Sequence, residues 1–289
     1  MYVKRSPFLS EQNESMAMTT IRDDFDSGEL DADTWVDHYL PQWTTPERSA
    51  ARYDGQSDGL RLRIDADQPA WREADGRMRV SNIQTGTFSG ALDSDRGTHR
   101  HRLDGLRVVT PQPTRRLWTP TAGEVTVRVS ASADPTLMVG IWLVGFEASG
   151  PEDSGELCIA ELFGDKIGPD TSIVRMGIKA HHDPRLVDEI RDIPLAIDAT
   201  EPHSYGVRWS GDVTEFSVDG DVVMTSGQRL NYEQQLMIDL FEFPADDLRD
   251  PENYPKTARI HSVRATSATR PARSAETGRP PHNPGTTIL

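Results

Sequence analysis

The sequence has a single cysteine, Cys158, among its 289 residues, so it cannot form an intrachain disulfide. It also lacks an apolar run long enough to cross a bilayer as a helix. The first residues carry Lys4 and Arg5, but no apolar stretch follows them, so the pattern of a secretory signal peptide is missing. Together these absences are typical of a reducing compartment, and we expect a cytoplasmic protein, with export by another route left open.

Positive charge is in short supply. The chain has 31 Lys and Arg residues against 46 Asp and Glu residues, which gives a formal net charge of −15 at pH 7. A chain this acidic repels phosphate backbones, anionic lipid surfaces and acidic polysaccharides. We therefore expect neither a nucleic acid nor a membrane as partner, and the charge favours a neutral ligand.

Motifs for phosphate binding and for serine nucleophiles are missing as well. The sequence contains no Gly-rich phosphate loop and no Gly-x-Ser-x-Gly elbow. The pairs His99/His101 and His181/His182 are a weak metal-binding pattern, for which a solvated loop is the better interpretation. The acidic stretch 23–26 lacks the spacing of an EF-hand. We expect no metal and no cofactor.

Short segments with period-two alternation dominate the chain, whereas helical periodicity is scarce. Residues 60–64, 125–129 and 259–265 alternate apolar and polar side chains, which predicts strands. Residues 216–218 and 222–224 flank Asp219-Gly220, which predicts a hairpin. One short helix is expected within 184–192. The pattern predicts one all-β sandwich domain over residues 21–268, between a disordered leader at 1–20 and a disordered, Pro-rich tail at 269–289.

The segment Gly155–Gly164 places two glutamates, Glu156 and Glu161, within an otherwise apolar run. An unpaired carboxylate is costly to bury, so these side chains should face solvent or line a cleft. In a regular strand they would point to opposite faces, because their positions differ by an odd number. A β-bulge at Ile159–Ala160 would bring them to one face. Both the regular and the bulged strand are compatible with the segment itself.

The bulged strand has a chemical consequence. Two carboxyl groups on one face can lie about 5–5.5 Å apart, the separation found in retaining glycosidases. In that chemistry one carboxylate attacks the anomeric carbon, and the other protonates the leaving oxygen and later activates water.

The segment resembles the signature of glycoside hydrolase family 16, which reads Glu-aliphatic-Asp-aliphatic-any-Glu in its bulged form, with Cys158 in the position of the Asp. Three further stretches are similar to the family in the correct order, and the resemblance covers about residues 22–265. They are Asp23-Asp24-Phe25-Asp26 with Leu30, Asp31 and Trp35; Val139–Val144; and His203-Ser204-Tyr205 through Trp209 with Phe216, Val218, Asp219 and Gly220. The resemblance implies a concanavalin A-like jelly roll of two antiparallel sheets with a cleft on the concave face.

The resemblance also assigns roles. It implies that Glu156 is the nucleophile and Glu161 the acid/base. Cys158 replaces the Asp that helps to set the protonation of the nucleophile, and a thiol is a weak hydrogen-bonding group that is neutral at pH 7. We therefore expect a lower rate or a displaced pH optimum. The alternative for Cys158 is a small apolar residue that fills space beneath the cleft.

Four further residues are candidates for sugar binding. Asp239 and Phe241 stand where some family members place an Asn and a Trp of the cleft, and Trp142 and His181 could line the same groove. A core position is an equally good interpretation for Phe241 and Trp142, and a surface position is the better one for His181. A structural calcium ion on the convex face occurs in the family, so the resemblance leaves room for one here.

The sequence as a whole predicts a retaining endo-β-glycosidase that acts as a monomer on a neutral β-linked polysaccharide. A non-catalytic carbohydrate-binding protein on the same fold is the alternative, with Cys158 marking the loss of activity. A third interpretation is an acidic β-sandwich that binds another protein.

Overall fold

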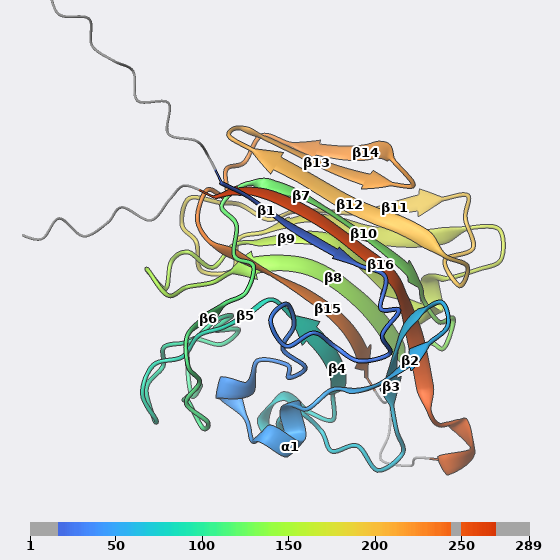
Figure 1. The fold of residues 1–289 in the computed structure, drawn as a ribbon, viewed down its shortest axis with the longest axis horizontal. Helices are drawn as coiled ribbons and strands as arrows, with labels where there is room; N and C mark the ends of the chain where they lie inside the picture. Colours follow the sequence, from blue (N-terminus) through green and yellow to red (C-terminus); the bar gives the residue numbers. More distant parts are fainter. Residues whose placement is uncertain (1–16, 244–249, 270–289) are drawn as a thin grey trace, which may run out of the picture.

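The computed structural model describes residues 17–243 and 250–269, which form two antiparallel sheets (Figure 1). The eight-stranded sheet has the order β14 (Asp221–Ser226), β13 (Val213–Val218), β12 (His203–Ser210), β7 (Gly123–Ser130), β16 (Lys256–Thr269), β3 (Gly59–Ile64) and β2 (Arg52–Gln56), and β1 (Ala17–Asp23) pairs with β16. The six-stranded sheet has the order β11 (Glu189–Leu195), β10 (Ser172–Lys179), β9 (Glu156–Phe163), β8 (Leu137–Gly145), β15 (Gln234–Glu242) and β4 (Arg79–Gln84).

The remaining elements are short. They are a two-stranded pair of β5 (Gly86–Thr87) and β6 (Arg115–Arg116), one helical turn α1 (Pro46–Ser49), and four 3₁₀ turns at Pro41–Trp43, Glu73–Asp75, Gly164–Lys166 and Pro251–Asn253. In the part of the chain that the structure describes, no helix is long and apolar enough to span a membrane. This architecture is the predicted all-β sandwich of two antiparallel sheets.

Alternation of side chains creates the core between the sheets. In β7 the side chains of Val125, Val127 and Val129 are buried, whereas their neighbours along the strand are more exposed, as the period-two pattern predicts. The hairpin at Asp219-Gly220 is also confirmed. Both residues have a positive φ, 50° and 91°, which is the backbone geometry of the tightest hairpin turns.

The helix expected within 184–192 is wrong. Residues 189–195 form the edge strand β11, which pairs along its whole length with β10. Pro194 lacks an amide hydrogen and is tolerated because only one side of an edge strand is paired. Pairing with β10 stabilises the extended form. The pattern of apolar residues within this segment could not show that β10 would lie beside it.

The boundaries of the sandwich differ slightly from those predicted. Strand β1 begins at Ala17, before the predicted domain start at residue 21, and β16 ends at Thr269, just past the predicted end at 268. All of β1 pairs with the C-terminal half of β16, residues 263–269, so the two strands lie side by side in the eight-stranded sheet (Figure 1). The rest of the predicted leader and of the predicted tail lies outside the described residues.

A second apolar cluster covers the other face of the six-stranded sheet. Loop side chains such as Tyr39, Trp43 and Trp71 pack there against Trp142 and Phe241, which project from β8 and β15. Figure 1 shows these loops, with α1, β5 and β6, gathered beside β4 and β15. This half of the sheet is covered by loops, and the β9–β10 side carries the charged residues described below.

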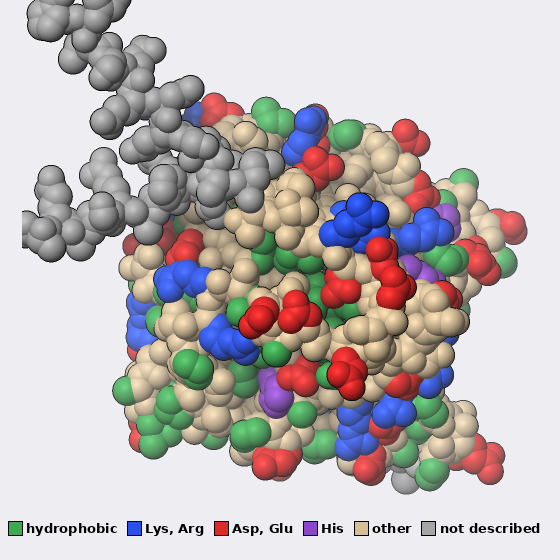
Figure 2. Space-filling view, in the orientation of Figure 1, with side chains coloured by type: hydrophobic (Ala, Val, Ile, Leu, Met, Phe, Trp, Pro, Cys, Tyr) green, Lys and Arg blue, Asp and Glu red, His purple; other side chains and the backbone are tan. Residues whose placement is uncertain are grey.

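Surface charge is mixed despite the negative total. Figure 2 shows acidic and basic side chains interspersed over the face it presents. Exposed ion pairs of this kind, such as Arg208 with Glu215, contribute little to stability because water and salt screen them.

The ion pair between Arg79 and Glu242 is fully buried. Arg79 and Glu242 are register partners on β4 and β15, their side chains are 2% and 1% exposed, and they contact each other directly. The carboxylate of Glu242 also accepts a hydrogen bond from the Tyr254 hydroxyl at 2.7 Å and lies 3.2 Å from Lys256 Nζ. A buried charge with one partner removed loses its compensation.

We therefore expect Glu242→Ala to lower the free energy of unfolding by about 3–5 kcal/mol, because Arg79 would stay buried without its partner. Glu215→Ala removes a carboxylate from an exposed pair and should cost less than about 1 kcal/mol. Chemical denaturation of both variants measures the difference. Equal losses in the two variants would contradict the assignment of the Arg79–Glu242 pair as a structural one.

Candidate active site

Strand β9 contains the predicted bulge. Ile141 of β8 pairs with Ala160 and Trp142 pairs with Cys158, so Ile159 has no register partner on β8. The extra residue changes the alternation of the strand. Leu157 and Leu162 point into the core between the sheets, and Glu156, Cys158 and Glu161 gather on the other side.

The two glutamates therefore share one face. One carboxylate oxygen of Glu156, one of Glu161 and the Sγ atom of Cys158 all lie within 4.8 Å of one another. The regular strand, with one glutamate on each face, is wrong. The side chains differ in access, because that of Glu156 is 2% exposed and that of Glu161 is 16% exposed.

Lys179 lies between the two carboxylates. Its Nζ atom is 3.0 Å from Glu156 Oε1 and 2.6 Å from Glu161 Oε1. Lys179 is the register partner of Glu156 on the neighbouring strand β10, so the sheet itself holds the ammonium group beside both acids. The positive charge compensates for placing two carboxylates close together in a site of low exposure.

Sequence reasoning missed Lys179, because its place beside Glu156 depends on how β10 pairs with β9. Arg175 lies on the same face of β10 and pairs with Glu161. Gly177 lies between Arg175 and Lys179, opposite Cys158, with φ +136°. A Cβ at this position would lie 2.0 Å from the backbone oxygen of Glu189, so the close approach of β11 requires glycine here.

The electrostatic setting keeps Glu156 ionised. Burial by itself raises the pKa of Glu156, but the Lys179 ammonium and a hydrogen bond with His181 outweigh it and lower the pKa to about 2. The His181 Nε2 and Glu156 Oε2 atoms are 2.7 Å apart. His181 therefore lies at the carboxylate pair, in contact with the predicted nucleophile.

Cys158 is a buried neutral thiol. Burial, with the nearby carboxylates of Glu161 and Glu156, raises the pKa of Cys158 well above its ordinary value. Its Sγ atom lies 3.6 Å from the backbone oxygen of Arg175, to which the thiol donates. The expected neutrality of the thiol is borne out, and the electrostatic partner of Glu156 at this site is Lys179.

The predicted sugar-binding residues of β15 take part in protein contacts. The carboxyl group of Asp239 is fully buried, where burial raises its pKa well above the ordinary value, and it accepts hydrogen bonds from Trp142 Nε1 and from Asn82 Nδ2. Asp239 thus fixes the indole of Trp142, which is 9% exposed. Phe241 is 4% exposed and meets Tyr39 edge-on at 5.3 Å, so it occupies the core position that the sequence left open.

His99 is not in a solvated loop, so that interpretation is wrong. The residue is 8% exposed, and its ring meets Trp142 at 5.0 Å and His181 at 4.9 Å between centroids. The loop is fixed by its neighbour Thr98, whose backbone oxygen accepts hydrogen bonds from the side chains of Gln42 and Trp43. The sequence pattern 98–102 carried no signal for this burial.

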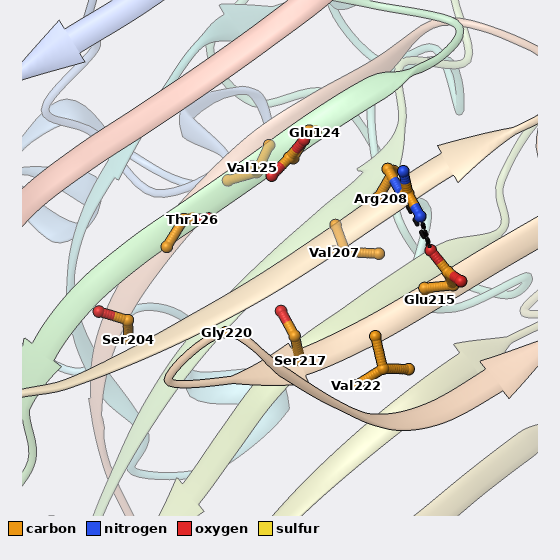
Figure 3. Close-up of a pocket in the computed structure, with 10 residues that line it drawn as sticks. All are labelled: Glu124, Val125, Thr126, Ser204, Val207, Arg208, Glu215, Ser217, Gly220 and Val222. Atoms are coloured by element: carbon orange, nitrogen blue, oxygen red, sulfur yellow. Dashed lines mark hydrogen bonds and ion pairs between the residues drawn. The ribbon is translucent and has the colours of Figure 1, made fainter.

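Two pockets lie on different sheets. One lies beside Glu161, where Phe163, Lys166, Arg175 and Asp192 surround it on the β9–β10 side of the six-stranded sheet. The other is on the eight-stranded sheet and is shown in Figure 3, where Arg208 and Glu215 form an ion pair across it. Because the paired glutamates belong to the six-stranded sheet, the pocket beside Glu161 adjoins the candidate site and the pocket in Figure 3 does not.

No protein-family model matches the chain, and no curated protein matches its sequence. Solved structures do match its fold. An endo-β-galactosidase from Clostridium perfringens that releases GlcNAcα1-4Gal has a TM-score of 0.72 at 21% identity, over 91% of this chain and 65% of that chain. The catalytic domain of an endo-1,3-β-glucanase (laminarinase) from Thermotoga petrophila RKU-1 has a TM-score of 0.58 at 13% identity, over 88% of this chain and all 100% of that chain.

A third match names the family. A non-specific endo-β-1,3(4)-glucanase from family GH16 has a TM-score of 0.58 at 16% identity, over 88% of this chain and 94% of that chain. The chain therefore has a jelly-roll fold like that of glycoside hydrolase family 16, as the sequence predicts. The chain spans just under two thirds of the length of the endo-β-galactosidase.

The His99 loop depends on a buried acid. Glu147 is 4% exposed, and its Oε1 atom accepts a hydrogen bond from the backbone amide of Arg100 at 3.3 Å. Burial raises the pKa of Glu147 to about 8. The folded protein therefore holds a proton that the unfolded chain releases near pH 4.5, and this contribution to stability is lost as the pH rises toward 8.

We expect Glu147→Gln to remove this pH dependence, because the amide keeps the acceptor oxygen and carries no ionisable proton. The stability of the variant relative to the unmodified protein should rise by roughly 4 kcal/mol between pH 5 and pH 8.5. Thermal unfolding at both pH values measures it. A constant difference between the two proteins would show that Glu147 titrates normally.

Proposed function

We propose that the protein is a retaining endo-β-glycosidase that hydrolyses a neutral β-linked polysaccharide. The observation that supports it best is the geometry of Glu156 and Glu161, two carboxylates on one face of a bulged strand with atoms within 4.8 Å. Retaining glycosidases need a separation of about 5–5.5 Å, and inverting enzymes need more room for a water molecule. The likeness to structures of endo-acting glycanases supports the same class.

In this proposal Glu156 is the nucleophile. Its low pKa keeps the carboxylate ionised, so a lone pair is available to form a bond with the anomeric carbon as the glycosidic bond breaks. Glu161 is the more exposed of the two and donates a proton to the departing oxygen. It then takes a proton from the water that cleaves the glycosyl-enzyme bond, which returns both carboxyl groups to their starting forms.

Lys179 controls when Glu161 can hold a proton. In the free protein its ammonium group contacts Glu161 Oε1, whereas the first step of the reaction needs a proton on Glu161. The substrate therefore has to draw the ammonium away from Glu161 as it binds. Cys158 supplies no charge, so Lys179 carries the electrostatic control of the pair.

A non-catalytic glycan-binding protein is the second candidate, and one observation favours it. Glu156 is almost fully buried, and its two oxygens are already in contact with Lys179 and His181. If the ammonium and imidazole groups stay in place when a sugar binds, the carboxylate cannot reach the anomeric carbon.

The test is a screen of the purified protein for new reducing ends on laminarin, lichenan, agarose and xyloglucan. On the substrate that is cleaved, Glu161→Gln should lower turnover by roughly 100- to 10,000-fold, because it removes the general acid and base. Glu201→Gln, at an exposed position in the loop before β12, is the matched control and should retain full activity.

Full activity in Glu161→Gln would contradict the proposal. Oligosaccharide binding without any product on prolonged incubation would select the non-catalytic alternative, and a binding measurement by calorimetry distinguishes the two.

A further inference from the structure

Three side chains from separate parts of the chain converge beside the carboxylate pair. His99 comes from the loop before β6, Glu156 from β9 and His181 from the segment that follows β10. Ring nitrogens of the two histidines and a carboxylate oxygen of Glu156 all lie within 4.8 Å of one another. The sequence offered these histidines only as a weak metal-binding pattern, and the fold brings two of them to one acid.

The ring of His99 packs against two other rings of the site. The residue is 8% exposed, and its ring meets Trp142 at 5.0 Å and His181 at 4.9 Å between centroids. These contacts hold its imidazole beside Glu156 and His181.

Both histidines are held in an uncommon backbone conformation. His99 has φ 51° and His181 has φ 48°, in the left-handed region that residues other than glycine seldom occupy. Strain of this kind persists where surrounding contacts impose it, and it concentrates at functional sites. Here the contacts of Thr98 with Gln42 and Trp43 fix the His99 loop before any ligand arrives.

The donor set suits zinc. Two imidazoles and one carboxylate, with a fourth position open to water, are a common zinc coordination. With metal–ligand bonds of about 2.0–2.1 Å, neighbouring ligand atoms of a tetrahedral ion lie about 3.3 Å apart. The ligand atoms of the three groups lie within 4.8 Å of one another, so side-chain adjustment has to bring them to that spacing around the ion.

The positive charge of Lys179 leaves one side of Glu156 free for such an ion. Lys179 contacts Oε1 and keeps Glu161 as its second partner, whereas His181 contacts Oε2. Arg175, on the same face, is paired with Asp192 at 2.7 Å. A divalent cation can therefore replace the hydrogen bond between His181 and Glu156 without displacing the ammonium group.

We propose that His99, His181 and Glu156 bind one Zn²⁺ ion, and that the bound ion switches off the proposed nucleophile by occupying its carboxylate. The inference goes beyond the proposed function, since the metal site exists whether or not the protein cleaves a glycan. In an active enzyme, micromolar zinc would act as a reversible inhibitor that a chelator removes.

The experiment is a titration of the metal-free full chain with Zn²⁺ in competition with a chromophoric zinc indicator. We expect one ion per chain at this site. Loss of a group that supports a ligand already costs about 10- to 100-fold in affinity, so His99→Ala and His181→Ala should each weaken binding by at least that much. His203→Ala is the matched control, because His203 pairs with Asp219 on the other sheet, and it should bind zinc as the unmodified protein does.

Two histidine variants are used so that the test does not depend on the folding of either one. His181 is partly exposed, so His181→Ala should keep the circular dichroism spectrum and melting temperature of the parent even if His99→Ala does not. Undiminished zinc affinity in folded His181→Ala, or the absence of saturable binding to the unmodified protein, would overturn the site. Because binding is measured without a substrate, a failed glycan screen leaves this result independent of the proposed function.

Discussion

The site depends on a single constraint, the presence of two carboxylates on one face of a strand whose other face is the core. A regular strand cannot meet it, because Glu156 and Glu161 would diverge. The unpaired Ile159 solves the geometry by changing the alternation within β9. Lys179 solves the electrostatics, since its ammonium lies within ion-pair distance of both acids. Without the bulge the two acids would lie on opposite faces, and without the ammonium group one of them would take up a proton.

The surrounding residues follow from that arrangement. Because Lys179 supplies the positive charge from β10, the position between the acids tolerates the neutral thiol of Cys158, which is fully buried and has a raised pKa. Asp239 acts indirectly, since its carboxyl group accepts a hydrogen bond from the indole of Trp142 and fixes the orientation of that ring. The fold is shared with endo-acting glycanases, and the charges around the two acids determine how these acids can react.

Local patterns predicted much of this structure. The Asp219-Gly220 hairpin and the strands of the sandwich follow from alternation and turn residues within a few positions, whereas the bulge was implied by the resemblance to the family signature. The features that the sequence did not predict depend on partners distant in sequence. The segment 189–195 is a strand because β10 lies beside it, and His99 is buried because its loop folds back over Trp142. Lys179 needed knowledge of which residue of β10 faces Glu156, and register between strands is set by the whole sheet.

The short distance between the carboxyl groups determines the stereochemistry of the proposed reaction. A pair this close leaves no room for a water molecule between the second carboxylate and the anomeric carbon, so the proposed hydrolysis passes through a glycosyl-enzyme intermediate. Proton NMR of a short β-linked oligosaccharide during the first minutes of hydrolysis reports the anomer released before mutarotation. The account predicts that the β-anomer forms first. An α-anomer formed first would contradict it, because inversion requires carboxyl groups that lie farther apart than Glu156 and Glu161 do.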